Sequence, residues 1–555
     1  MRESRAPGRP ARSAWPVDER HEWAGSAPSI PPVPPVPLVP PGPGPRRQPS
    51  RSTGGRLAAI PGQITGTIKA VGNSTAVVVA QLINRAAMYI AFLLASLTLP
   101  LYDFGLYTLV LALKEILNSV ATFGLDQVLI RLLARADSME ARKRLLRDAV
   151  VLKLLCSAIA GAVLLDGMLW LRVSNDLVLG SAIMLADLIL ANLSSSLMSY
   201  YQARLLSSTP TMLQAVARAL DLAGMVAGML TGASWLVLLE ILLLSDALLC
   251  VLLTVKLGRH LGAVVAIPLP YRTQMFFEAI PLGIASIGVL LYTRIDTMLI
   301  ANLRNVSEVA YYSAAYKLTE SPLVIMTGIS ATVLPLISSL AMSPDIRQRI
   351  AAIAQRSLRY TYTLSLIAAV AVTFFGRQMV AVIYEGRYTQ IAPAVVILIW
   401  GTVAMASNSV TASIYTAMKR QRLLMVVVGV NLVVNLAVNL WAIPRWGYFG
   451  SAVATTATEG VNMLVQVVIL CWLLGQARLA FTTALALIVG GASITLYFLM
   501  DGRPSPLLGA EALGALVIIL LLCRMVTRDD IQRMRGAARR ILSRRRRLAP
   551  YGSAR

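Results

Sequence analysis

Apolar stretches of about 20 residues recur along most of this chain, with short polar segments between them, and they constrain the fold more than any other feature. A helix of about that length crosses the hydrocarbon core of a bilayer, and soluble domains do not contain such repeats. Only 14% of the 555 residues are charged, against roughly a quarter in soluble domains. The sequence therefore predicts an all-α polytopic membrane protein and excludes a soluble enzyme.

The apolar stretches predict fourteen transmembrane helices, arranged as two six-helix lobes followed by two C-terminal helices. Their ranges are 73–98, 106–133, 146–171, 177–200, 212–230, 235–256, 275–300, 311–340, 358–383, 392–417, 423–443, 449–474, 479–500 and 506–526. The predicted domains are a disordered Pro/Arg-rich tail (1–72), an N-lobe (73–257), a C-lobe (275–474), a helix pair (479–526) and a basic tail (527–555).

The distribution of basic residues predicts the orientation. With a cytoplasmic N-terminus, the inner loops hold seventeen Lys and Arg and the outer loops five, as the positive-inside rule requires. Both tails are then cytoplasmic, and their positive charge is expected to contact anionic lipids. We therefore predict a multi-pass protein of the inner (plasma) membrane. The net charge of +24 is assigned to lipid rather than to nucleic acid, which we do not expect as a partner.

The chain offers little material for catalysis or metal binding. It has two histidines, and its four cysteines lie in apolar runs without metal-ligand spacing, so we expect no metal site, no cofactor and no catalytic residues. The predicted outer loops are about ten residues or shorter, which leaves no room for the extracytoplasmic domain of a glycan polymerase or ligase. We therefore expect no enzyme. A silent scaffold is disfavoured because it would not need charges inside the membrane.

Charged residues inside the predicted helices are the candidate functional residues, because each costs roughly 2.5–3.5 kcal/mol at the bilayer centre. The basic ones are Arg85, Lys114, Lys153, Arg218, Arg294 and Lys317. The acidic ones are Glu115, Asp126, Asp166, Asp187, Asp221, Glu240, Asp246, Glu278, Asp296, Glu320 and Glu459. Such groups must face one another or water.

Spacing predicts some pairs. Arg218 with Asp221 and Lys317 with Glu320 are three residues apart, so each pair shares a helix face. Lys153 is expected to extend its amine to the inner interface.

Other charged positions predict partners on neighbouring helices or a cavity. Arg294 and Asp296 are two residues apart and cannot share a helix face, so at least one needs a partner elsewhere. Arg85 has no acid beside it, and a cavity-facing role is predicted for it. A cavity-facing role is also predicted for Lys114, which lies one helical turn from Asn118.

Amides and prolines add two further expectations. Asn431, Asn435 and Asn439 form a stripe that is expected to bond neighbouring helices, although such a stripe can also line a hydrated path. Pro281 and Pro322 interrupt the seventh and eighth helices, where freed backbone carbonyls permit a bend.

A faint internal repeat supports two lobes of the same orientation. Residues 103–107 (Asp-Phe-Gly-Leu-Tyr) and 308–312 (Glu-Val-Ala-Tyr-Tyr) each place an acid, a small residue and a tyrosine at a helix entry. An arginine precedes each tyrosine, Arg85 in the first copy and Arg294 in the second. An offset of six helices corresponds to a parallel repeat about an axis along the membrane normal.

Several motifs together resemble a known family. They are residues 99–107, Phe123-Gly124-Leu125-Asp126-Gln127 with Arg131, Arg294-Ile295-Asp296, residues 310–317, Pro335, residues 384–388 and residues 443–452. Their order and residues resemble the polysaccharide-exporter flippases of the MOP (MATE-like) exporter superfamily over about residues 73–500. The first helix has fewer arginines than is typical of the lipid II flippase branch.

This resemblance implies a flippase that moves a polyprenyl-pyrophosphate-linked oligosaccharide to the outer leaflet by alternating access, for cell-surface polysaccharide export. It implies Arg85, Lys114, Arg294 and Lys317 as substrate-binding residues. It also implies that Asp296 and Glu320 couple an ion, H+ or Na+, or pair with those cations. Glycan polymerases or glycosyltransferases are candidate partners. The alternative is a MATE-like cation-coupled drug or metabolite antiporter, which a basic cavity would disfavour.

Overall fold

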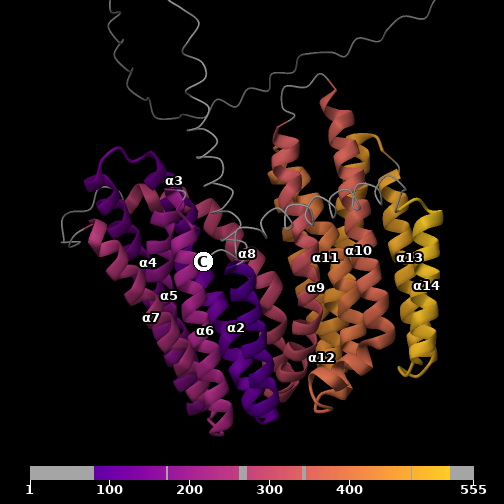
Figure 1. Cartoon of the computed structure of the whole chain (residues 1–555), viewed down its shortest axis with the longest axis horizontal. Helices are drawn as coiled ribbons and strands as arrows, with labels where there is room; N and C mark the ends of the chain where they lie inside the picture. The colour runs from indigo at the N-terminus through magenta and orange to yellow at the C-terminus, as the bar shows by residue number, and fades with distance from the viewer. Residues whose placement is uncertain are drawn as a thin grey trace, which may run out of the picture. The chain divides into compact units, whose positions relative to one another are not determined.

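The computed structural model describes residues 80–170, 173–204, 206–261, 272–339, 345–476 and 478–525 (Figure 1). All of them belong to one compact unit. The predicted tails 1–72 and 527–555 lie outside these ranges. The described elements are helical: Ala80–Thr98, α2 (Leu101–Thr122), α3 (Leu125–Arg135), α4 (Met139–Trp170), α5 (Asn175–Ala203), α6 (Ser208–Leu230), α7 (Trp235–Leu261), α8 (Arg272–Leu303), α9 (Val306–Ser338), α10 (Ile346–Ile383), the 3₁₀ helix η1 (Thr389–Ile391), α11 (Ala392–Ala417), α12 (Gln421–Leu474), α13 (Arg478–Leu499) and α14 (Pro506–Leu522).

Within those ranges, ten helices are long and apolar enough to cross a membrane, or up to twelve if the bent helices α8 and α9 each count as one span. The protein is thus a multi-span membrane protein. The count of fourteen, the cytoplasmic termini and the lobe boundaries stay predictions.

Several predicted helix limits were wrong. The predicted helix 106–133 is two elements, α2 and α3, because Phe123 (φ 41°) and Gly124 (φ 71°) both adopt the left-handed conformation. Conversely, α10 begins twelve residues before the predicted residue 358. Hydropathy detects only the part of a helix that lies in hydrocarbon, and a helix can continue past it.

The longest element, α12, folds back on itself. Its 54 residues would extend about 80 Å as a straight helix, far more than the roughly 30 Å of hydrocarbon. Gly447 interrupts it with φ 59° and ψ −140°. Asn435 Nδ2 donates to Thr458 Oγ1 at 2.9 Å, so the arms on either side of Gly447 run antiparallel. These arms correspond to the predicted helices 423–443 and 449–474.

Two further helices bend where proline or glycine weakens the backbone ladder. α9 bends by 43° between Val306–Leu323 and Gly328–Ser338, directly after Pro322 as predicted. α8 bends by 42° between Met275–Gly288 and Leu290–Leu303, later than the predicted Pro281.

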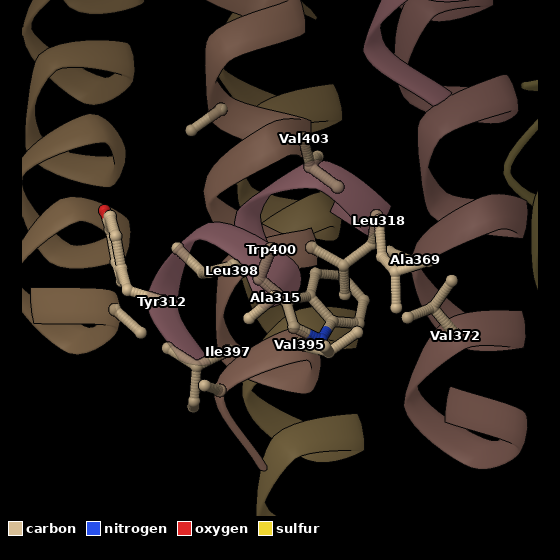
Figure 2. Close-up of a cluster of buried hydrophobic side chains, with 14 of the residues drawn as sticks. Tyr312, Ala315, Leu318, Ala369, Val372, Val395, Ile397, Leu398, Trp400 and Val403 are labelled. Carbon is tan, nitrogen blue, oxygen red and sulfur yellow. The ribbon is translucent and has the colours of Figure 1, made fainter. Parts of the chain in front are cut away.

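The helices pack as two groups. In the N-terminal bundle (the helix Ala80–Thr98 and α2 to α7), α5 packs against α7 and α4, and α6 against α7. In the C-terminal bundle (α8 to α14), α11 lies between α9, α10 and α12 (Figure 1). Figure 2 shows the core of this second bundle, where Leu318 and Trp400 are among the buried side chains. Contacts of α2 with α8 and α9 join the bundles.

Candidate functional site

A cavity of about 260 Å³ lies between Ala80–Thr98, α2, α6, α7, α8 and α9, and is called here the central cavity. Its charged lining residues are Lys114, Glu115, Arg218, Asp221, Arg294, Lys317 and Glu320. Four of the six candidate residues therefore meet at one site. This volume lies just below the roughly 300–1,000 Å³ of typical small-molecule sites, so the cavity has room for a headgroup and not for an oligosaccharide.

The other two candidates, Arg85 and Asp296, do not line the central cavity. Arg85 is exposed on its helix and makes no ion pair within the described residues. The neighbouring Asn84 is the buried one, and its Nδ2 donates to Gln214 Oε1 at 3.1 Å. The predicted role of Arg85 stays a prediction.

The N-terminal bundle contributes a network of two bases and three acids. Lys114 on α2 pairs with Asp187 on α5 and lies 3.8 Å from Asp246 Oδ2 on α7. Arg218 Nη2 is 2.7 Å from Asp246 Oδ1, and its predicted partner Asp221 is also close, at 3.7 Å. The acids are at most 5% exposed. Because the network draws on four helices, it ties the bundle together behind the cavity wall.

The ion pairs formed by Arg294 of α8 and Lys317 of α9 are more exposed than the network of the N-terminal bundle. Arg294 Nε lies 2.5 Å from Glu115 Oε2, and its Nη2 donates to Glu115 Oε1 at 3.3 Å. Lys317 Nζ donates to Glu320 Oε2 at 3.3 Å, which confirms that predicted pair. Aromatic rings support both cations, because Arg294 lies 5.8 Å from the ring centre of Tyr316 and Lys317 lies 5.5 Å from that of Phe92.

These pairs decide the electrostatics of the central cavity. Four basic side chains line it, and their carboxylate partners, counting Asp187 and Asp246 behind the wall, number five. The basic lining that sequence predicted is present, but each of its cations already has an acidic partner. An anion entering the cavity must therefore compete with a carboxylate.

Asp296 lies outside the cavity in a different setting. It is 3% exposed and has no basic group within ion-pair distance in the described chain. Tyr312 Oη and Thr455 Oγ1 donate to Asp296 Oδ2 at 2.8 and 2.7 Å, and Asn439 Nδ2 donates to Oδ1 at 3.1 Å. Arg294 and Asp296 thus both have partners on other helices, whereas their spacing predicted this for at least one of them.

A second buried acid, Glu459, is held in the same way. It accepts from Tyr292 Oη at 2.5 Å and from Asn408 Nδ2 at 2.7 Å, while Asn431 Nδ2 donates to Tyr292 Oη at 2.7 Å. The predicted asparagine stripe therefore bonds α8 at Asn431 and Asn439, and the second arm of α12 at Asn435. From sequence, Glu459 was one of the acidic residues in the predicted helices, but its partners could not be predicted because they lie on distant helices.

One predicted charge placement was wrong. Lys153 does not extend to the interface: it is 1% exposed and pairs with Asp126, and its Nζ donates to Ser195 Oγ at 2.8 Å. The α2–α3 break makes this possible, because it places Asp126 at the start of a short helix that packs against α4 and α5.

The two bundles touch at the end of α2 where the predicted outer loops lie. Gly105 packs so tightly against Val306 that any side chain there would overlap its carbonyl. Tyr388 Oη donates to the Ser96 carbonyl at 3.1 Å, and Arg387 donates to the Leu97 carbonyl. Burial raises the pKa of Tyr388 to about 12, so its hydroxyl remains a donor at physiological pH.

The bundles also touch at the other end of α2. A Cβ on Gly283 would lie 2.6 Å from the Phe123 ring, and Arg131 pairs with Glu278. Next to this contact lies a second cavity of about 530 Å³, lined by Glu115, Asn118, Ser119, Thr122, Gln127, Leu282, Ser286 and Leu290. Glu115 lines both cavities. Inter-bundle contacts therefore lie at both ends of α2, with the two cavities between them.

No group of three or more His, Cys, Asp or Glu in the described ranges is arranged to hold a metal ion. All four cysteines are free thiols.

Two family models match the chain. The polysaccharide biosynthesis protein family matches residues 70–341, and the MatE family matches residues 281–441. A probable low-salt glycan biosynthesis flippase of Haloferax volcanii, Agl15, is 21% identical over 183 residues, which are 33% of this chain and 39% of the relative. The matched segment thus covers well under half of that relative.

Solved structures share the fold. The lipid II flippase MurJ in an inward closed conformation matches 80% of this chain and 97% of its own, with a TM-score of 0.62 and 13% identity. An inward-facing multidrug resistance MATE family transporter matches 74% and 99%, with a TM-score of 0.60 and 13% identity. Residues 70–341 are thus similar to the polysaccharide biosynthesis protein family, and the chain shares its fold with a lipid II flippase and with a transporter of the MOP superfamily.

Proposed function

We propose that this protein is a flippase that moves a polyprenyl-pyrophosphate-linked oligosaccharide across the inner (plasma) membrane by alternating access, for cell-surface polysaccharide export. The observation that carries this proposal is the central cavity, which lies between the two bundles and is lined by Arg294, Lys317 and Lys114. Arginine binds phosphate oxygens bidentately and lysine binds them as a point charge. The similarity to a probable glycan biosynthesis flippase supports the same substrate class.

The proposal assigns Arg294 and Lys317 to the diphosphate, because both are accessible from the cavity and have aromatic rings beside them. Lys114 is assigned a supporting role behind them. Arg85 is retained as a contact for a conformation in which its helix faces the pathway. Glycan polymerases and glycosyltransferases are proposed as partners that supply or consume the lipid-linked glycan.

Asp296 is the proposed coupling group, for H+ or Na+. Its carboxylate is buried and bonded only to neutral donors in the described chain, and Asn439 Oδ1 beside it has no hydrogen-bond partner. An additional proton or cation can therefore be accommodated here without displacing a basic residue. Glu320 is assigned to charge pairing with Lys317.

The alternative is a MATE-like antiporter, and one observation favours it. Counting partners, five carboxylates accompany four bases at the central cavity, so an organic cation would not be repelled. The identity of the transported molecule, a lipid-linked glycan or an organic cation, distinguishes the two functions.

The test is reconstitution of the full chain in proteoliposomes. We expect a fluorescent polyprenyl-diphosphate disaccharide to change leaflet, with transport lost in Arg294→Gln and Lys317→Gln. Arg445→Gln, a change at an exposed arginine outside the cavity, should transport normally. Asp296→Asn should remove dependence on the ion gradient. Gradient-driven export of an organic cation without glycan movement would reject the flippase and favour the antiporter.

A further inference from the structure

The ion pair between Glu115 and Arg294 differs from the other pairs of the central cavity. Lys114 and Arg218 bind acids of their own bundle, and Lys317 binds Glu320 on its own helix. Glu115 lies on α2 and Arg294 on α8. Of the ion pairs that the structure describes at this cavity, it is therefore the one that ties the two bundles together.

This pair is also accessible. The Glu115 side chain is 47% exposed and that of Arg294 is 26% exposed, whereas Asp187 is fully buried. Glu115 lines both cavities, and Arg294 lines the central one. A ligand that enters from either cavity can reach the pair without disturbing a buried charge.

The contact geometry matches that of a bound phosphate. Two nitrogens of the Arg294 guanidinium face two oxygens of Glu115, and a guanidinium presents the same fork to carboxylate and to phosphate. Tyr316 stays beside the guanidinium, so Arg294 keeps one neighbour if Glu115 leaves. An incoming phosphate would thus take the position that Glu115 holds.

We propose that Glu115 is a built-in competitor of the substrate headgroup: a diphosphate displaces it from Arg294, and this displacement releases α2 from α8. The inference rests on the proposed function, because it requires an anionic headgroup. It deepens that function by coupling headgroup binding to the separation of the bundles.

The released carboxylate has a place to go. The second cavity presents the side chains of Asn118, Ser119, Thr122 and Gln127 next to Glu115. Amide and hydroxyl groups can donate hydrogen bonds to a carboxylate without a cation. In the displaced state the carboxylate would therefore have neutral donors on α2 and α3, besides Ser286 of α8, and no ion pair would tie it to α8.

The first measurement is binding of inorganic pyrophosphate and of farnesyl diphosphate, as separate probes, to the purified full chain in nanodiscs. Glu115→Gln should bind both probes roughly threefold to tenfold more tightly, because the competing charge is gone. Glu115→Asp, which keeps the charge but is one methylene too short for the bidentate contact, should change affinity in the same direction. This second variant guards against misfolding of the first.

The second measurement is the distance between spin labels on Arg135 of α3 and Thr273 of α8, both exposed, in a variant without native cysteines. Pyrophosphate should add a longer-distance population in the wild type, and Glu115→Gln should show that population without ligand. Glu320→Gln removes an equal charge from the same cavity but crosses no bundle boundary, so its distances should match the wild type.

The outcomes separate this inference from the proposed function. Tight binding by the wild type, with unchanged affinity and distances in Glu115→Gln, would overturn the inference and leave the flippase standing. Failure of both probes to bind the wild type would reject the anionic substrate and the inference with it. A response to farnesyl diphosphate alone, enhanced in Glu115→Gln, would support the inference and show that the lipid anchors the headgroup.

Discussion

The buried charged side chains of the predicted membrane helices are each bonded to an oppositely charged or polar side chain. Lys153, 1% exposed, has Asp126 and Ser195, and Asp296 has three neutral donors. Removing one partner of a buried ion pair destabilises a protein by more than the intact pair stabilises it, because the remaining charge is left buried and uncompensated. The stability of the N-terminal bundle should therefore depend on its shared acid, Asp246.

Asp246→Asn is expected to destabilise the protein by about 1.5–3 kcal/mol, because Arg218 loses its partner at 2.7 Å and keeps only Asp221 at 3.7 Å. Denaturant unfolding in detergent measures this. Glu140→Gln, at a surface pair with Lys143, should change stability by less than about 1 kcal/mol. Equal effects of Asp246→Asn and Glu140→Gln would contradict this account.

At the scale of elements, a few residues decide where helices break. Gly124 separates α2 from α3, and Gly447 reverses α12. Glu308 closes the second of these turns, because its Oε2 accepts from the Tyr448 N–H at 2.8 Å and its Oε1 from Arg304 Nε at 3.0 Å. A turn that requires positive φ and close packing at one residue tolerates only glycine there.

Gly447→Ala should lower the stability of the protein by about 1–3 kcal/mol, because alanine is strained at φ 59° and its Cβ would overlap Glu308 Oε2. The melting temperature in detergent is the readout. Gly460→Ala, in the second arm of α12 with nothing within 4 Å of an added Cβ, is the matched control. The same melting temperature for both variants would refute the assigned role of the turn.

At the scale of the whole molecule, inter-bundle contacts lie at both ends of α2. Gly105 meets Val306 near its start, and Gly283 meets Phe123 just past its end, about 27 Å farther along the helix axis. That separation is close to the hydrocarbon thickness. A side chain added at one glycine should therefore open one end of the central cavity and leave the other end closed.

Gly105→Ala should raise labelling of a cysteine placed at the cavity residue Thr297 by an impermeant maleimide from the predicted outer side. Gly283→Ala should raise it from the predicted inner side. Right-side-out and inverted vesicles give the two measurements. Gly288→Ala on α8, where a Cβ meets nothing within 4 Å, should match the parent. Increased labelling from the same side in both glycine variants would disprove separate contacts at the two ends.

The sequence by itself determined the membrane class, the family resemblance and the pairs within one helix. Apolar length fixes what can cross hydrocarbon, and the i,i+3 spacing fixes which side chains meet on one helix, as Lys317 and Glu320 do. The two tyrosines of the faint repeat, Tyr107 and Tyr312, also reach the same cavity.

Tertiary structure alone decided the pairs between helices and the electrostatics of the cavity. Glu115 stands beside Lys114 in sequence, yet it bonds Arg294, which is 179 residues away. No local rule relates such positions, because the rotation of each helix about its axis is set by packing against its neighbours. For the same reason, sequence predicted Lys114, Arg294 and Lys317 as cations of a cavity. It could not predict that acids from α5 and α7 neutralise Lys114 and Arg218.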